Sequence, residues 1–307
     1  MDEKYTKHFE AYPSLALIGN TNLVRVRLFE DELPDVRIYA KCEWTNPGGS
    51  LKDRPVMKML LDAINDGRLT KDKTILDSSS GNAGIAYAMI GGMMGYKVEL
   101  VVPGNASAER KKRILAHGAT LTQTDPLEGY DAALRHCHQL YEDNKDKYFL
   151  SDQYSNDSNW QAHFHFTAGE ILAQTEGRLT HFVGGVGTGG SITGIGRRLK
   201  EHNKDIRVVS VLPDNFPGIE GLKPLENPED IRPKILDESV IDDWKRVTID
   251  DAFDYCARLA KSGLFLGQSS GAYLKVAHDV AKEIKKGTIV TIFCDIGERY
   301  FSTRLWD

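Results

Sequence analysis

The sequence has few cysteines and no long apolar run, and both shortages limit the kind of protein it encodes. Its four cysteines, at positions 42, 137, 256 and 294, form no C-x-x-C pair. We therefore expect reduced, mostly buried thiols and no disulfide framework. No apolar stretch approaches the roughly 20 residues of a membrane helix. The amino terminus, MDEKYTKHFE, is acidic and polar, unlike a secretory or transit signal. These features favour a cytoplasmic protein that binds no membrane.

Basic runs and metal-ligand patterns are also missing. The 39 basic and 44 acidic residues give a net charge of -5 and are mixed along the chain, so the sequence has no nucleic-acid footprint. His136, Cys137 and His138 are adjacent, and on a helix their side chains point in different directions, so we expect no metal site. With 307 residues, 41% of them hydrophobic, the chain can form two packed domains of ordinary size.

Strand-like and helix-like segments alternate along most of the chain. We expect strands at residues 37–44, 74–76, 97–102, 120–124, 180–183, 206–212 and 288–293, with helices between most of them. This order predicts an α/β fold of two domains, each an open, mostly parallel sheet flanked by helices. Residues 148–160 interrupt the alternation. We therefore expect an N-terminal domain at 1–150, with part of 1–45 packing on the other domain, and a C-terminal domain at 151–307.

Lys52 stands in the most informative stretch, Asn46-Pro-Gly-Gly-Ser-Leu-Lys-Asp-Arg54. The glycines allow a tight turn, Ser50 can cap the following helix, and Lys52 is then expected in its first turn. There it faces the positive end of the helix dipole, which favours a neutral, nucleophilic amine such as one that binds pyridoxal phosphate. An ordinary exposed lysine is the alternative.

Two further loops suit anions. Asp77-Ser-Ser-Ser-Gly-Asn-Ala-Gly84 and Gly184-Gly-Val-Gly-Thr-Gly-Gly-Ser191 each lie between a predicted strand and a helix. The first could be an ordinary strand–helix loop. The second has five glycines, more than a turn needs, which favours a phosphate cradle. It also satisfies G-x-G-x-x-G, so with Asp214 as the ribose-binding acid an NAD-dependent dehydrogenase is a competing hypothesis.

Pyridoxal phosphate explains more of these loops than NAD does, because it needs an amine, a phosphate cradle, a partner for the ring nitrogen and donors for the substrate carboxylate. With these motifs the chain resembles the cysteine synthases, the O-acetylserine sulfhydrylase and cystathionine β-synthase family of fold type II, or tryptophan synthase β-like, enzymes. The resemblance runs nearly end to end, to Gly297-Glu298-Arg299-Tyr300. This ending and Pro217–Lys223 are closer to the B-type enzymes.

The resemblance implies a role for each matching residue. Lys52 matches the lysine that binds the cofactor and is the catalytic base, Asn82 the partner of the ring oxygen, and Ser269 the partner of the ring nitrogen. The phosphate loop matches Gly187, Thr188, Gly189, Gly190 and Ser191. The substrate carboxylate would be held by Ser79, Ser80, Gly81, Ala83 and Gln153.

The implied reaction is a β-replacement. An activated serine, O-acetylserine or O-phosphoserine, would lose its β-substituent to leave an aminoacrylate, to which sulfide adds to give L-cysteine. Condensation of serine with homocysteine is the alternative within the family. Ala83 replaces a common threonine, and Asp157-Ser158 replaces a common Pro-Ala. Lys223 could attract a phosphoryl group, although an ordinary solvated loop lysine is the favoured alternative. The resemblance also implies a homodimer and a possible complex with serine acetyltransferase.

Overall fold

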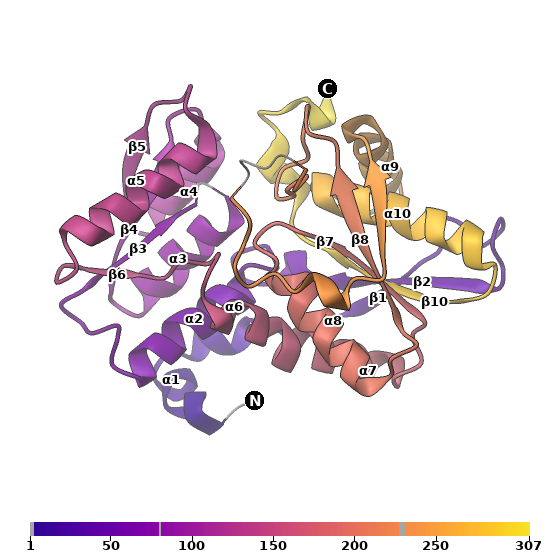
Figure 1. Cartoon of the computed structure of the whole chain (residues 1–307), viewed down its shortest axis with the longest axis horizontal. Helices are drawn as coiled ribbons and strands as arrows, with labels where there is room; N and C mark the ends of the chain where they lie inside the picture. Colours follow the sequence, from indigo (N-terminus) through magenta and orange to yellow (C-terminus); the bar gives the residue numbers. More distant parts are fainter. Residues whose placement is uncertain (1–2, 80, 227–230) are drawn as a thin grey trace. The chain divides into compact units, whose positions relative to one another are not determined.

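The computed structural model describes residues 3–79, 81–226 and 231–307, and the chain divides into two compact units (Figure 1). The first unit comprises the chain up to Ile18 and Asn46–Asn159, and the second comprises Gly19–Thr45 and Trp160–Asp307. The division thus follows Asn159 and not residue 150. Residues 19–45 belong to the second unit because strand β2 (Val36–Cys42) pairs along its length with the last strand, β10 (Gly287–Phe293).

In the described part of the first unit, four parallel strands form a sheet in the order β5-β4-β3-β6. They are β3 (Thr74–Ser78), β4 (Lys97–Pro103), β5 (Thr120–Thr124) and β6 (Tyr148–Leu150). The helices are α1 (Thr6–Ala11), α2 (Asp53–Asn65), α3 (Asn82–Met93), α4 (Ala108–Ala116) and α5 (Gly129–Asp143), and α6 (Asp157–Ala162) begins at the end of the unit. The short strand β6 lies where the sequence predicted none, because only three residues pair there.

The second unit contains a six-stranded sheet among its described residues, in the order β1-β2-β10-β7-β8-β9. Only β1 (Leu23–Val26) runs antiparallel to its neighbour. The remaining strands are β7 (His181–Gly185), β8 (Arg207–Pro213) and β9 (Asp243–Val247), and the helices are α7 (Ala168–Thr175), α8 (Gly190–His202), α9 (Ile249–Lys261) and α10 (Gln268–Ile284). The prediction of an α/β fold with mostly parallel sheets is confirmed.

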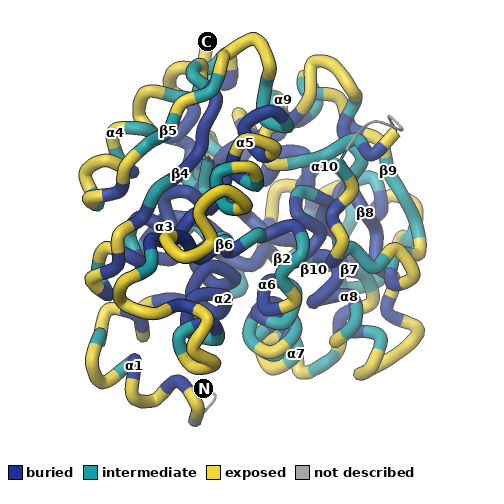
Figure 2. Tube along the Cα trace, turned by 60° about the vertical axis from the view of Figure 1, so that its left-hand side comes forward, coloured by how far each residue is buried: buried dark blue, intermediate teal, exposed yellow. Residues whose placement is uncertain are grey.

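Burial explains which elements the sequence predicted well. All five residues of β3 are buried, as are the last five of β10, and Figure 2 shows most of the strands in the colour of buried chain. Such strands are buried on both faces because helices cover a parallel sheet from both sides. The edge strand β9 (DWKRV) is mostly half-buried or exposed, so its composition gave no strand signal.

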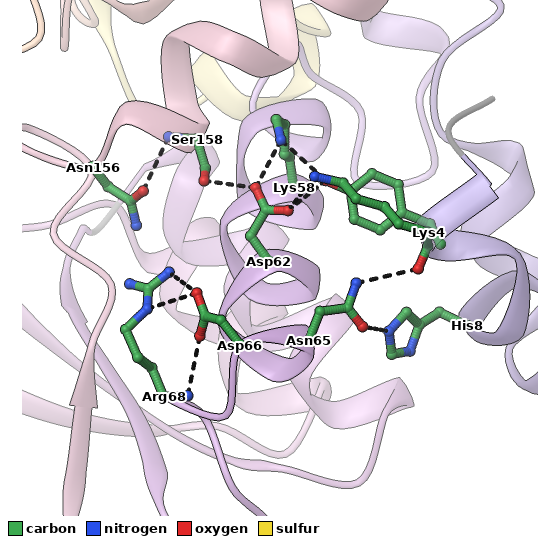
Figure 3. Close-up of polar contacts among 10 residues, drawn as sticks. Lys4, His8, Lys58, Asp62, Asn65, Asp66, Arg68, Asn156 and Ser158 are labelled. Carbon is green, nitrogen blue, oxygen red and sulfur yellow. Dashed lines mark hydrogen bonds and ion pairs between the residues drawn. The ribbon is translucent and has the colours of Figure 1, made fainter.

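A polar cluster centred on Asp62 joins three segments of the first unit (Figure 3). The Asp62 carboxylate accepts hydrogen bonds from the Lys58 amine at 2.7 Å, the Tyr5 hydroxyl at 2.6 Å and the Ser158 hydroxyl at 2.7 Å. Lys4 forms an ion pair with it at 2.9 Å. Helix α2, which follows Lys52, is thereby fastened to the N-terminal segment and to the start of α6.

Candidate active site

Lys52 lies at the N-cap position of α2, one residue before the first turn in which the sequence predicted it. Its backbone N–H donates to the Ser50 hydroxyl at 3.2 Å. Ser50 therefore orders the turn before α2, and the prediction that it caps the helix is wrong, because the N-cap residue is Lys52 and α2 has no side-chain cap. The turn itself is tight. Gly49 has φ of 76°, a conformation that favours glycine.

Asp53 fixes the loop before Lys52, a role that the sequence analysis missed. It is fully buried in the first turn of α2, and its carboxylate accepts the backbone N–H of Gly48. A Cβ on Gly48 would lie 2.2 Å from the Asp53 carboxylate, so a larger residue here would displace that carboxylate from its contact. A carboxylate at this end of a helix also complements the helix dipole. A Pro-Gly-Gly turn with an acidic residue next to the lysine is the sequence signal that could have indicated this contact between Asp53 and Gly48.

The predicted carboxylate loop starts α3. Its N-cap is Gly81, followed by Asn82 and the buried Ala83 as the first residues of the helix. The Ser79 hydroxyl accepts the backbone N–H of Gly84 at 3.1 Å, so this oxygen caps the helix and leaves its O–H proton as a donor. A Cβ on Gly84 would meet the Ser79 carbonyl oxygen at 2.1 Å, which explains this glycine. Ser80 lies outside the described residues.

Gln153 lies beside this loop. Its side chain is buried, and its Nε2 donates to the Ser78 carbonyl at 3.4 Å. Asn159 in turn donates to the Gln153 carbonyl at 2.7 Å. The fold thus brings Gln153 next to Ser78, just before the predicted carboxylate loop, although the two residues are far apart in sequence.

Helix α4 contacts the Lys52 loop and the first turn of α3. Its Arg113 donates to the Pro47 carbonyl at 3.1 Å, in the Lys52 loop. The neighbouring Ile114 packs at the first turn of α3, within 3.2 Å of where a Gly84 Cβ would stand. The Lys52 loop and the start of α3 therefore share one supporting helix.

The glycine loop of the second unit lies between β7 and α8, and Gly187, Thr188, Gly189, Gly190 and Ser191 follow one another across it. Gly189 has φ of 83° and is the N-cap of α8, which begins at Gly190 without a capping side chain. A Cβ on Gly187 would lie 2.4 Å from the Gly221 carbonyl oxygen. The Lys223 backbone N–H donates to the Val186 carbonyl at 2.7 Å, so residues 221–223 run along the loop. Backbone amides at an uncapped helix start suit a phosphate.

Ser269 is the second residue of α10 and is buried. The same helix start is braced by Gln268, whose side-chain oxygen accepts the Glu220 backbone N–H at 3.1 Å, and by Ser270, whose hydroxyl accepts the Cys294 N–H at 2.9 Å. The segment containing Glu220 and Lys223 thus touches both the Ser269 helix and the glycine loop. This link could not be predicted from the sequence, because Gln268 resembles any polar residue at a helix start.

Buried acids and thiols of this fold have altered proton affinities. Burial raises the pKa of Asp77, at the end of β3, to about 7. Burial also raises the pKa of the Cys42 thiol to about 11 and that of Cys256 to about 12, so these cysteines are inert thiols.

No group of three or more His, Cys, Asp and Glu side chains within the described ranges could hold a metal ion. None of the helices that the structure describes is both long and apolar enough to cross a bilayer.

Comparison with known proteins decides which chemistry this arrangement serves. Residues 15–295 match the model of the family described as pyridoxal-phosphate dependent enzyme. A cysteine synthase of Aquifex aeolicus (strain VF5) is 50% identical over 99% of this chain and 94% of its own length. The chain belongs to the pyridoxal-phosphate dependent enzyme family. This membership confirms the predicted cofactor and removes the dehydrogenase hypothesis that the glycine run had left open.

Two further relatives extend the likeness within the family. Cysteine synthase B of Pseudomonas aeruginosa is 37% identical, over 96% of this chain and 98% of the relative. The solved structure of cysteine synthase (OASS) from Entamoeba histolytica is 34% identical with a TM-score of 0.89, over 95% of this chain and 90% of that one. The resemblance to cysteine synthases, B-type enzymes among them, is confirmed by sequence and by fold.

The residues of this chain fit the family's cofactor. A phosphate needs donors without a competing side chain, and α8 begins with no side-chain cap at a loop where Gly187 leaves no room for a Cβ. An aldehyde needs an amine, and Lys52 supplies one at the start of α2.

Proposed function

We propose that this protein is a cysteine synthase, which makes L-cysteine by replacing the β-substituent of an activated serine with sulfide. The observation that carries the proposal is the 50% identity to a cysteine synthase over 99% of the chain. Similarity of this extent includes every loop in which the sequence predicted a site residue. A match confined to the cofactor loops would have left the reaction open, since cofactor and fold are shared by many activities.

Lys52 has two tasks in this proposal. Its amine would hold the aldehyde of the cofactor, and it would also serve as the general base that removes the proton from the substrate α-carbon. Its position at the N-cap of α2, in a loop fixed by the buried Asp53, restricts where the amine can go. When bound, pyridoxal phosphate supplies an electron sink for the charge that develops at the α-carbon.

The other predicted residues bind and orient. Asn82, Ser269 and the loop Gly187–Ser191 would hold the cofactor. Ser79, Ser80, Gly81, Ala83 and Gln153 would hold the substrate carboxylate, helped by backbone amides at the start of α3. A serine at the ring nitrogen, with no carboxylate, stabilises a protonated ring less. That favours prompt loss of a β-substituent over transamination.

The leaving group is tested by an absorbance titration of the cofactor-loaded protein. O-acetylserine, O-phosphoserine and serine are added separately, the visible band of the bound cofactor is followed, and sulfide is then added. We expect one of the activated serines to shift the band and sulfide to restore it with formation of cysteine. A response to serine alone, reversed by homocysteine, would replace this proposal with cystathionine synthesis.

The assembly and location of the protein are part of the same proposal. Family resemblance suggests a homodimer in the cytoplasm that can bind serine acetyltransferase, and four free, buried cysteines suit a reducing compartment. Light scattering should give about twice the chain mass of 34.3 kDa. Co-elution of serine acetyltransferase with the protein, lost when O-acetylserine is added, would support a complex at the active site, and separate elution would contradict it.

A further inference from the structure

Asp77 is a buried acid that contacts the backbone next to both segments that we assign to the substrate carboxylate, the loop before α3 and the segment containing Gln153. It is the fourth residue of β3, with 1% of its surface exposed, and it precedes Ser79 by two residues. Its Oδ1 accepts the Ser78 backbone N–H at 2.7 Å. The backbone N–H of Gln153 also lies close enough to lower its pKa. One carboxyl therefore contacts the backbone on both sides of the proposed carboxylate site.

The described groups that shift the pKa of Asp77 are polar or acidic, and none of them is a cation. The Tyr87 hydroxyl from α3 lies beside it, and that hydroxyl donates to Ser151 at 2.9 Å. From the turn after β6, Asp152 raises its pKa further. Three more titratable groups feel its charge, namely Tyr130 and Cys137 of α5 and Tyr154.

One oxygen of this carboxyl is poorly satisfied. Asp77 Oδ2 is buried and has no well-formed hydrogen bond to any residue in the described parts of the chain. An ionised carboxylate in that position is more costly than a protonated one. Burial accordingly raises the pKa of Asp77 to about 7, so both protonation states are populated near neutral pH.

We propose that Asp77 is a positioning residue that couples binding of the substrate carboxylate to the uptake of a proton. The inference rests on the proposed function, because it takes Gln153 and the start of α3 as the carboxylate site. A carboxylate bound there places a second negative charge near Asp77, and like charges disfavour joint ionisation. The bound state therefore favours protonated Asp77, which holds Ser78 and Gln153 in place without opposing the substrate.

The sign of the pH dependence follows from this linkage. If the pKa of Asp77 rises by about one unit on binding, the bound state carries more protons than the free state between roughly pH 7 and 8. Binding therefore weakens as pH rises through this range. The apparent Kd for a carboxylate would increase about fivefold from pH 6 to pH 8, and about half a proton would be taken up at pH 7.5.

Calorimetry with propionate tests this directly, because propionate has a carboxylate but no amine and no leaving group. The cofactor-loaded protein is titrated at pH 6, 7 and 8 in two buffers of different ionisation enthalpy, which counts the protons bound. The wild type should show the fivefold weakening and the proton uptake. Asp77→Asn, which keeps the shape and removes the acid, should show neither, and Asp77→Glu should restore proton uptake.

Controls separate this inference from its alternatives. Asp66→Asn, which removes an exposed acid paired with Arg68 at the end of α2, should behave as the wild type. The inference is overturned if the wild type takes up no proton, if it fails to bind propionate at pH 6, or if Asp77→Asn keeps the pH dependence. Should the asparagine variant not fold, the wild-type proton count and Asp77→Glu decide. The absorbance titration with O-acetylserine judges the proposed function separately, since it does not depend on proton uptake.

Discussion

Replacing Asp62 by asparagine should destabilise the first unit by an amount that depends on pH. The carboxylate is the counter-charge of Lys58, whose side chain is only 3% exposed and whose amine lies 2.7 Å away. Burial lowers the pKa of Lys58 and Asp62 opposes that effect. Without Asp62 the buried ammonium is left without its closest counter-charge, which typically costs about 3–5 kcal/mol in a buried pair.

The loss of stability cannot exceed the free energy of deprotonating Lys58, because a neutral amine no longer needs a counter-charge. An unfolded lysine has a pKa near 10.4, so neutralising it costs about 4 kcal/mol at pH 7.5 and about 1 kcal/mol at pH 9.5. A group whose folded pKa is depressed in this way destabilises the fold most at low pH and not at all above its unfolded pKa. We therefore expect Asp62→Asn to lose about 3 kcal/mol at pH 7.5 and roughly 1 kcal/mol at pH 9.5.

Urea unfolding followed by far-UV circular dichroism at the two pH values measures this difference. Tryptophan fluorescence would not serve, because Trp44, Trp160, Trp244 and Trp306 all belong to the second unit. The double variant Asp62→Asn/Lys58→Met removes both charges and should recover much of the loss. The control Asp66→Asn, at an exposed pair on the same helix, should change stability by less than about 1 kcal/mol. Equal losses at pH 7.5 and 9.5 would refute the reasoning.

Three further predictions concern the cofactor and the substrate. Lys52→Arg should abolish both the visible band of the bound cofactor and turnover, because a guanidinium does not lose its proton in proteins; retained turnover would contradict the assignment. Gly187→Ala should weaken cofactor binding about tenfold or more in a fluorescence titration, since its Cβ would lie 2.4 Å from the Gly221 carbonyl oxygen, whereas Gly169→Ala, with nothing within 4 Å, should bind as the wild type does. Lys223→Met should raise KM for O-phosphoserine roughly fivefold and leave that for O-acetylserine within about twofold; equal changes in steady-state assays would rule out a phosphoryl contact.

Local sequence determined the elements and the loops between them. Helix α9 forms because apolar side chains recur along it and Thr248 and Asp251 form a capping box at its start. Strand β5 also matches its prediction. The positions of Lys52 at a helix start and of the glycines before α8 follow from turn and cap chemistry, which depends on neighbouring residues. A family resemblance could be stated because these loops occur in a recognisable order.

Tertiary structure decided what lies next to what. A π-helical turn at His163–Thr167 joins α6 to α7, at a point where Gly194 packs so closely that its Cβ would lie 2.1 Å from the Trp160 carbonyl oxygen. Asp62 and Asp77 look like ordinary acids in the sequence. One bonds to Ser158, 96 positions away, and the other is buried beneath a strand end. Contacts of this kind depend on how sheets order and bury their strands, which local propensity does not encode.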